Sequence, residues 1–132
     1  MSLDGERPVV RITRHALESA LMGAKNSYPS EFLGLFRERD GILCELFLAP
    51  LSISDENSAT FPVFYMPTDP TIVATFHSHP SHGVAQPSRA DKDLFSRHYR
   101  IHFIASLPYT PQSTYAFNNE GEAISFEIID WE

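Results

Sequence analysis

Two histidines and an aspartate stand at a spacing that can hold one metal ion. His77 and His79 flank a single residue, and Asp91 follows further along the chain. The segment Thr71–Phe76 predicts a strand that runs into His77, and residues two apart in a strand point to the same face. Residues 88–97 predict a helix whose first turn carries Asp91. We therefore expect the three side chains to converge where a strand end meets a helix start.

Two imidazoles and one carboxylate are the ligands of a zinc ion that does chemistry. Catalytic zinc takes three protein ligands and keeps the fourth position for water, whose pKa it lowers to about 7. A structural zinc site is closed by a fourth ligand, usually a cysteine. The only cysteine, Cys44, is far from the histidines in the sequence. The pattern therefore favours hydrolytic chemistry, with one zinc ion per chain.

The order of these residues resembles the signature of the JAMM (MPN-plus) zinc metalloproteases. His-Ser-His-Pro occupies positions 77–80 and is followed by Ser88 and Asp91. Upstream, Glu31 and Gly34 stand where that family carries Glu-x-x-Gly. The resemblance covers nearly the whole chain, and the sequence looks similar to small, free-standing members of the prokaryotic type. A match of this length is a specific signal.

The resemblance implies both a fold and a set of zinc ligands. The fold is the MPN fold, an α+β domain in which a curved, mixed β-sheet is sandwiched by helices, with zinc at one edge of the sheet. The implied ligands are His77, His79 and Asp91. Elements read from the sequence agree with an α+β domain, because helices are predicted both before and after the middle strands.

Glu31 and Ser88 are the candidate catalytic residues. Amide hydrolysis needs a carboxylate that takes a proton from water and passes one to the leaving amine, and Glu31 is the candidate for this general base. The alternative is an ordinary exposed glutamate at the entrance of a strand. The resemblance implies that Ser88 donates a hydrogen bond to the oxyanion, a contact typically worth about 2.7–4 kcal/mol in the barrier. Ser88 with Asp91 also resembles a helix capping box, worth about 1 kcal/mol.

The resemblance also suggests the substrate class. JAMM relatives cut an isopeptide or peptide bond after the C-terminal tail of ubiquitin or a ubiquitin-like protein. The segments around the motif are short here, so we expect a ubiquitin-like or sulfur-carrier protein substrate rather than linkage-selective cleavage of ubiquitin chains. The alternative function is a non-catalytic MPN scaffold that binds partner proteins in an assembly. A zinc deaminase would need a pair of cysteines, which this chain lacks.

Composition limits the number of domains and the classes of function that remain. With 132 residues, 42% of them hydrophobic, the chain fits one domain, which we place at residues 9–132 after a flexible segment at 1–8. A net charge of −7 opposes nucleic-acid binding. No apolar stretch approaches the roughly 20 residues of a membrane helix, so we expect a cytoplasmic protein. Cys44 lies in an apolar run, which favours a buried thiol.

The expected elements follow from periodicity and from turn residues. Thr13 is the expected N-cap of a helix that runs to about Lys25, and Asp40-Gly41 predicts a hairpin. Pro80 is expected to end the strand that carries the histidines, and residues 50–60 are expected to form a surface loop. Strands are predicted at residues 9–12, 31–39, 42–48, 61–65, 71–77, 101–105, 113–117 and 123–129.

Four further histidines and Ser78 complete the polar residues of interest. Ser78 alternates with the two candidate ligands, so its side chain is predicted to point to the opposite face and to pack there or support the site. His82 is interpreted as an exposed loop residue, with contact to substrate or to a second metal as the alternative. His15, His98 and His102 are interpreted as residues at the surface or at the margin of the core.

Overall fold

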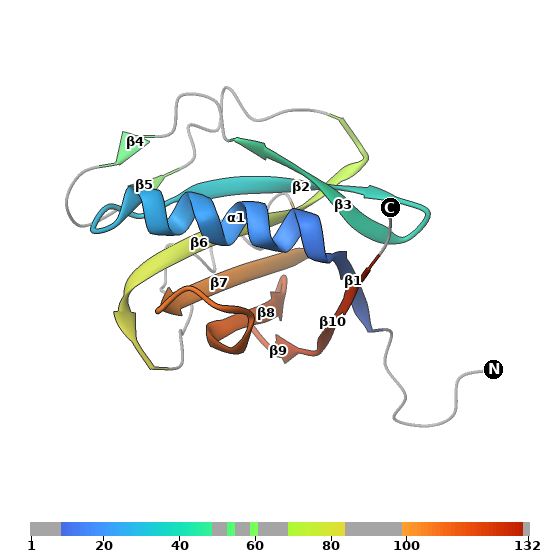
Figure 1. Ribbon diagram of the computed structural model, residues 1–132. Helices are drawn as coiled ribbons and strands as arrows, with labels where there is room; N and C mark the ends of the chain where they lie inside the picture. The colour runs from blue at the N-terminus through green and yellow to red at the C-terminus, as the bar shows by residue number, and fades with distance from the viewer. Residues whose placement is uncertain (1–8, 49–52, 55–58, 61–68, 84–98, 131–132) are drawn as a thin grey trace.

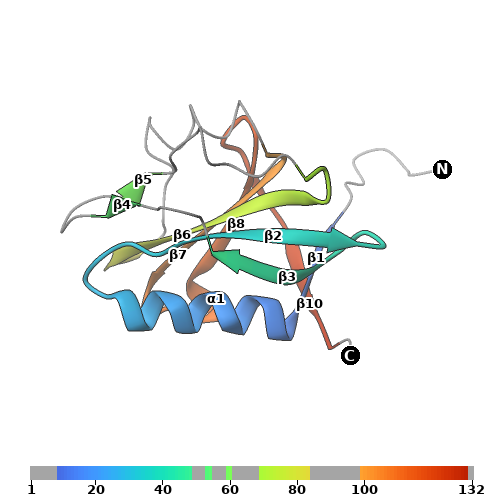
Figure 2. The same cartoon turned by 90° about the horizontal axis from the view of Figure 1, so that it is seen from above.

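The computed structural model describes residues 9–48, 53–54, 59–60, 69–83 and 99–130. They form a large sheet with one α-helix, α1 (Arg14–Ser27), packed along one face of it, as Figures 1 and 2 show. The sheet strands are β1 (Val10–Thr13), β2 (Leu33–Arg39), β3 (Ile42–Leu48), β6 (Ile72–His82), β7 (Ile101–Leu107), β8 (Thr114–Asn118), β9 (Ala123–Ile124) and β10 (Phe126–Ile129).

The eight strands lie in the order β10-β1-β3-β2-β6-β7-β8-β9. Parallel pairs join β1 to β10, β1 to β3, and β6 to β7, whereas β2 is antiparallel to both β3 and β6. This mixed sheet with a helix on one face confirms the predicted α+β class. The second predicted helix, residues 88–97, lies outside the described residues.

Helix α1 begins where the sequence predicts. The Thr13 hydroxyl accepts a hydrogen bond from the Ala16 amide at 3.1 Å, so Thr13 is the N-cap. The buried stripe repeats at helical spacing and faces the sheet. It comprises Ala16, Leu17, Ala20, Leu21 and Ala24.

The face of the sheet under α1 is an aromatic core. Phe36 on β2 packs edge-on against Phe76 on β6 and Phe103 on β7, with ring centroids 6.2 and 5.6 Å apart. The Phe32 ring packs edge-on against Phe76 as well. It also fills the notch left by Gly23 of α1, where a Cβ atom would come within 2.4 Å of the ring. Phe32 therefore fixes the chain entering β2 against the helix.

The Asp40-Gly41 hairpin is confirmed. Both residues have positive φ, 53° and 79°, as a two-residue type I′ turn requires. The turn joins β2 to β3, and a register shift between Arg37 and Glu38 interrupts their pairing.

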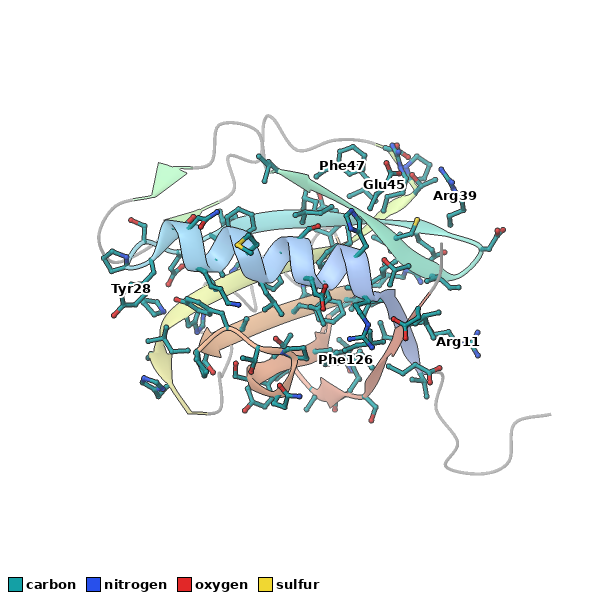
Figure 3. All side chains as sticks on the ribbon, in the orientation of Figure 1. Arg11, Tyr28, Arg39, Glu45, Phe47 and Phe126 are labelled. Carbon is teal, nitrogen blue, oxygen red and sulfur yellow. The ribbon has the colours of Figure 1, made fainter. Side chains whose placement is uncertain are left out.

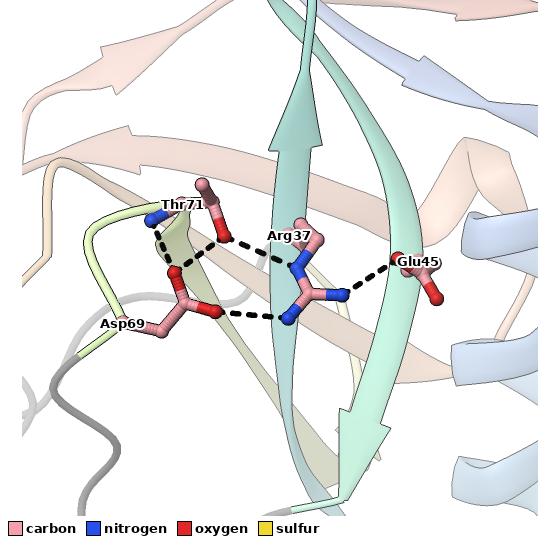
Figure 4. Close-up of polar contacts among 4 residues, drawn as sticks. All are labelled: Arg37, Glu45, Asp69 and Thr71. Atoms are coloured by element: carbon pink, nitrogen blue, oxygen red, sulfur yellow. Dashed lines mark hydrogen bonds and ion pairs between the residues drawn. The ribbon is translucent and has the colours of Figure 1, made fainter.

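Near that hairpin, Arg37 ties three chain segments together, as Figure 4 shows. Its guanidinium pairs with Glu45 at 3.1 Å and with Asp69 at 2.9 Å, and donates to the Thr71 hydroxyl at 3.1 Å. It also lies 4.6 Å from the centre of the Phe47 ring, a cation–π contact. Hydrogen bonds from the Thr71 hydroxyl and amide, and then from Arg37, lower the pKa of Asp69 to about 2. The network fixes the chain just before β6.

Several predicted element bounds were wrong. Pro80 does not end its strand, because β6 continues to His82. The pairing of β6 with β7 shifts between His79 and His82, and a proline is tolerated in such an irregularity because no ladder donor is needed there. Within the loop predicted at residues 50–60, β4 (Ile53–Ser54) pairs with β5 (Ala59–Thr60).

The chain after β8 also differs from its prediction. The single strand predicted at residues 123–129 is two strands, β9 and β10, on opposite sides of the sheet order. Phe126 of β10, labelled in Figure 3, packs edge-on against Phe103 with centroids 5.3 Å apart. The strand predicted at 61–65 lies outside the described residues. No helix in the described part of the chain is long and apolar enough to cross a membrane.

Candidate metal centre

Strand β6 carries both candidate histidine ligands on one face. In its ladder with β7, His77 lies opposite Ile104 and His79 lies opposite Ser106. Ala74 and Phe76, which alternate with the histidines, belong to the core under α1, so both imidazoles are on the face away from the helix. His77 is buried and His79 is half-buried.

The pair lies at the strand end, not at the lateral edge of the sheet. Strand β6 has β2 on one side and β7 on the other, near the middle of the strand order. The zinc position that the resemblance implied, at one edge of the sheet, therefore corresponds to the end of central strands. This is where β2 begins and where its pairing with β6 stops.

Glu31 lies next to this end of β6. Leu33 pairs with His77, and one residue earlier the Ser78 amide donates to the Phe32 carbonyl at 3.0 Å. Half-buried Glu31 comes immediately before Phe32, at the point where the chain joins this ladder. The structure thus places Glu31 near the end of β6 that carries both histidines. It places Glu31 just before β2, so the strand predicted from residue 31 begins two residues later.

The other two sequence candidates, Ser88 and Asp91, lie outside the described residues. Among the residues that are described, no group of three His, Cys, Asp or Glu side chains is arranged to hold a metal ion. The donor set that is described still has a clear chemical preference. Two adjacent imidazoles suit zinc and similar transition metals, whereas calcium and magnesium prefer oxygen ligands. The residues present therefore fit the zinc that the spacing predicts.

Behind the histidines, Ser78 and Tyr109 form a buried polar layer on the helix side. The Ser78 side chain is fully buried, as predicted from its alternation, and its hydroxyl accepts the Phe32 amide at 2.7 Å. The Tyr109 hydroxyl is buried without a hydrogen-bond partner among the described residues. Burial raises the pKa of Tyr109, the nearby Ser78 hydroxyl lowers it, and the charges of Tyr28 and Glu31 raise it. Glu31 and Ser78 are thus both close to this tyrosine.

His102 is the clearest residue that the sequence interpretation misplaced. It is fully buried on β7, opposite Thr75, rather than at the surface or at the margin of the core. Its Nε2 donates to the Tyr99 carbonyl at 2.9 Å, which in the neutral ring leaves Nδ1 to accept the Thr75 hydroxyl at 2.7 Å. The apolar run around it, Ile101–Leu107, is typical of a strand covered on both faces and could have indicated this burial.

The remaining polar candidates are more ordinary. His82 is exposed, as expected, although it belongs to the end of β6 and not to a loop. His15 is exposed on α1. Cys44 is half-buried on β3, so the thiol predicted to be buried is only partly covered. His98 lies outside the described residues.

Fold and histidine strand together define an MPN-type α+β protein, and comparison with known proteins shows its family. A model of the prokaryotic homologs of the JAB domain, Prok-JAB, matches residues 13–118. A protein of Haloferax volcanii named "Probable metalloprotease" is 36% identical over 140 residues, which cover 98% of this chain and 86% of that protein. The chain therefore belongs to the prokaryotic branch of the JAB, or JAMM, family.

Solved structures agree with this assignment. A JAB1/MPN domain protein from Archaeoglobus fulgidus superposes with a TM-score of 0.72 at 29% identity, covering 91% of this chain and 99% of that one. A second structure, described as "JAMM: A Metalloprotease-like Zinc Site in the Proteasome and Signalosome", gives a TM-score of 0.70 at 28% identity. It covers 93% of this chain and 100% of that one. The predicted MPN fold is thus confirmed.

Proposed function

We propose that this protein is a zinc-dependent metalloprotease. The observation that carries the proposal is that β2 begins beside the end of β6 that carries His77 and His79, with Glu31 two residues before β2. Membership of the JAMM family and the similarity to a probable metalloprotease support it. His77, His79 and Asp91 would hold the ion, which when bound supplies an activated water and polarises the scissile carbonyl.

The chain's own residues would handle the protons and the developing charge. Glu31, at the entrance of β2, would accept a proton from the attacking water and pass it to the leaving amine. The half-buried position of Glu31 suits this role, because a carboxylate there is close to the site yet still reached by water. Ser88 would donate a hydrogen bond to the oxyanion.

We further propose that the scissile bond follows the C-terminal tail of a ubiquitin-like or sulfur-carrier protein, as an isopeptide or a linear peptide. An extended tail is a suitable substrate for a site at the end of a sheet, because exposed strand ends can pair with it through main-chain hydrogen bonds. Beyond Ser78, β6 continues to His82 while its ladder with β2 has ended. Among the described residues no strand ladder continues on the β2 side of that stretch, and we propose that the substrate tail lies there.

The test is hydrolysis by purified protein of known zinc content. Ubiquitin-like and sulfur-carrier proteins fused to a short C-terminal extension, or joined to lysine, would be incubated with and without a zinc chelator, and mass spectrometry would locate the cut. We expect cleavage after the tail that the chelator abolishes and added zinc restores. Zinc-loaded protein that cleaves none of these substrates would contradict the proposal and leave the binding scaffold as the better account.

Glu31→Gln separates proton transfer from metal binding. The amide is close in size to the carboxylate but cannot accept the proton, so we expect the variant to keep its zinc and lose about 10²- to 10⁴-fold in kcat. Glu38→Gln is the matched control, because Glu38 is on the same strand and pairs with Arg100 at the far end. Normal cleavage by Glu31→Gln would require another general base.

A further inference from the structure

The contact between Ser78 and Phe32 replaces a normal rung of the sheet. In a regular antiparallel pair the Phe32 amide would donate to the Ser78 carbonyl. It donates instead to the Ser78 hydroxyl at 2.7 Å, while the Ser78 amide still donates to the Phe32 carbonyl at 3.0 Å. The side chain between the two histidines therefore decides how the chain leaves the ladder at the residue next to Glu31.

From this contact we propose that Ser78 is a positioning residue for Glu31. The inference rests on the proposed hydrolase function and deepens it by assigning a role to a residue that cannot itself reach the substrate. Ser78 is fully buried on the helix side of β6, and the histidines that flank it are on the other side. Its hydroxyl fixes the Phe32 backbone, and the next residue along the chain is the candidate general base.

The packing of Phe32 makes this anchor rigid. The Phe32 ring occupies the Gly23 notch of α1 and packs edge-on against Phe76 with centroids 6.0 Å apart. The backbone amide and the side chain of Phe32 are thus held from two directions on the helix side. A residue held in this way leaves its neighbour little freedom, and a displacement of about 1 Å at a reacting group can cost about 100-fold in rate.

The hydroxyl of Ser78 cannot be replaced by a neighbouring group. Tyr109 is close to Ser78 in the buried layer, but it is Ser78 Oγ, and not the phenol oxygen, that accepts the Phe32 amide. Without Ser78 Oγ the part-buried Phe32 amide would lose the acceptor that it has here. An amide shielded from water and without an acceptor is unfavourable, so the chain at Phe32 would shift toward another acceptor or toward water. Glu31 would move with it.

The experiment compares Ser78→Ala with Ser78→Thr, which restores the hydroxyl. For Ser78→Ala we expect kcat to fall about 10- to 100-fold while KM stays within about twofold and zinc content is unchanged. Hydrogen exchange at the Phe32 amide should become at least about tenfold faster. Ser78→Thr should recover most of both properties.

Thr13→Ala is the matched control. The Thr13 hydroxyl is also buried and also accepts a backbone amide, but at the N-cap of α1. Its loss should lower thermal stability without changing kcat or the exchange of Phe32. A double variant with Glu31→Gln should be no slower than Glu31→Gln alone, because Ser78 acts only through that carboxylate.

Each outcome decides between two hypotheses. Wild-type protein that holds zinc but hydrolyses no substrate overturns the proposed function and the positioning role with it. An active wild type whose Ser78→Ala variant keeps its kcat, or loses its zinc, overturns the positioning role alone. Rapid exchange of the Phe32 amide in the wild type would overturn it as well, whatever happens to the Ser78→Ala variant.

Discussion

The two ends of the β2–β6 pair are fixed in different ways. One end is fixed by an ion-pair network, and the other, beside the candidate metal centre, by uncharged contacts. At the Arg37 end, one guanidinium pairs with two carboxylates, so both carboxylates have an ion-pair partner inside the network (Figure 4). At the Glu31 end, a hydroxyl and an aromatic ring fix the backbone from the helix side. Figure 3 shows these ends far apart, with Glu45 and Phe47 near the first and Tyr28 near the second.

The difference shows which charged side chains take part in fixing the sheet. The carboxylates around Arg37 are committed to the guanidinium, so that end stabilises the sheet and has little capacity left for a ligand. At the other end the fixing contacts are neutral and lie behind the strand. The two contacts that fix the backbone at this end therefore do not themselves use the His77, His79 or Glu31 side chains. We expect substitutions at the two ends to affect different properties.

The largest effect should follow from removing a ligand at the histidine end. His77→Ala takes away one of two adjacent imidazoles, so we expect bound zinc to fall from about one ion per chain to near zero. Hydrolysis should then fall to the rate measured without protein. Metal analysis and a cleavage assay check this, and chelation of the wild type should give the same loss.

Asp69→Asn is the matched control for that loss. It alters the network at the opposite end of the same strand pair, so zinc content and kcat should stay at wild-type values. A similar loss of zinc in both variants would mean that the two ends are not separate in function.

How far the sequence predicts this arrangement depends on the range of the interaction. The N-cap Thr13 and the Asp40-Gly41 turn are local, and both are predicted correctly because the residues that decide them are adjacent. The shared face of His77 and His79 is equally local, since it follows from alternation along one strand. The MPN fold itself was predictable only from the resemblance, because strand order is set by distant contacts.

What the sequence did not reveal depends on partners far along the chain. The extension of β6 beyond Pro80 depends on the shifted register with β7, and the burial of His102 depends on Thr75 and Tyr99. The contact of Ser78 with the Phe32 amide joins residues 46 positions apart. Period-2 alternation gives the direction of a side chain but not the donor that it meets.

Gly23→Ala should have an intermediate effect. It tests, from the helix side, the contact that fixes the Glu31 end of the strand pair. Alanine normally favours a helix over glycine by about 1 kcal/mol. Here its Cβ would come within 2.4 Å of the Phe32 ring, and overpacking typically costs about 1–3 kcal/mol. We expect no gain in the free energy of unfolding and a several-fold lower kcat, because Phe32 must move next to Glu31. Chemical denaturation and the cleavage assay measure the two quantities.

The control for Gly23→Ala relieves the clash. Phe32→Leu shortens the side chain that occupies the notch, so the added cost of Gly23→Ala should be smaller in that background. If Gly23→Ala instead stabilised the protein by the full helix-propensity gain and left kcat unchanged, the notch would have no role in fixing the entrance to β2.

The smallest effect should appear at the Arg37 end, as a pH dependence of stability. The pKa of Asp69 is lowered from its usual 3.8 to about 2, chiefly by hydrogen bonds from Thr71. A carboxylate whose pKa is lower in the folded state than in the unfolded chain contributes stability above about pH 4, and loses it as the pH falls toward 2. The amide side chain of the Asp69→Asn variant cannot titrate, so the difference in unfolding free energy between wild type and variant should shrink across that window. Denaturation curves at several pH values measure it, and a difference that stays constant from about pH 5 to about pH 2 would show that the Asp69 charge does not stabilise this end.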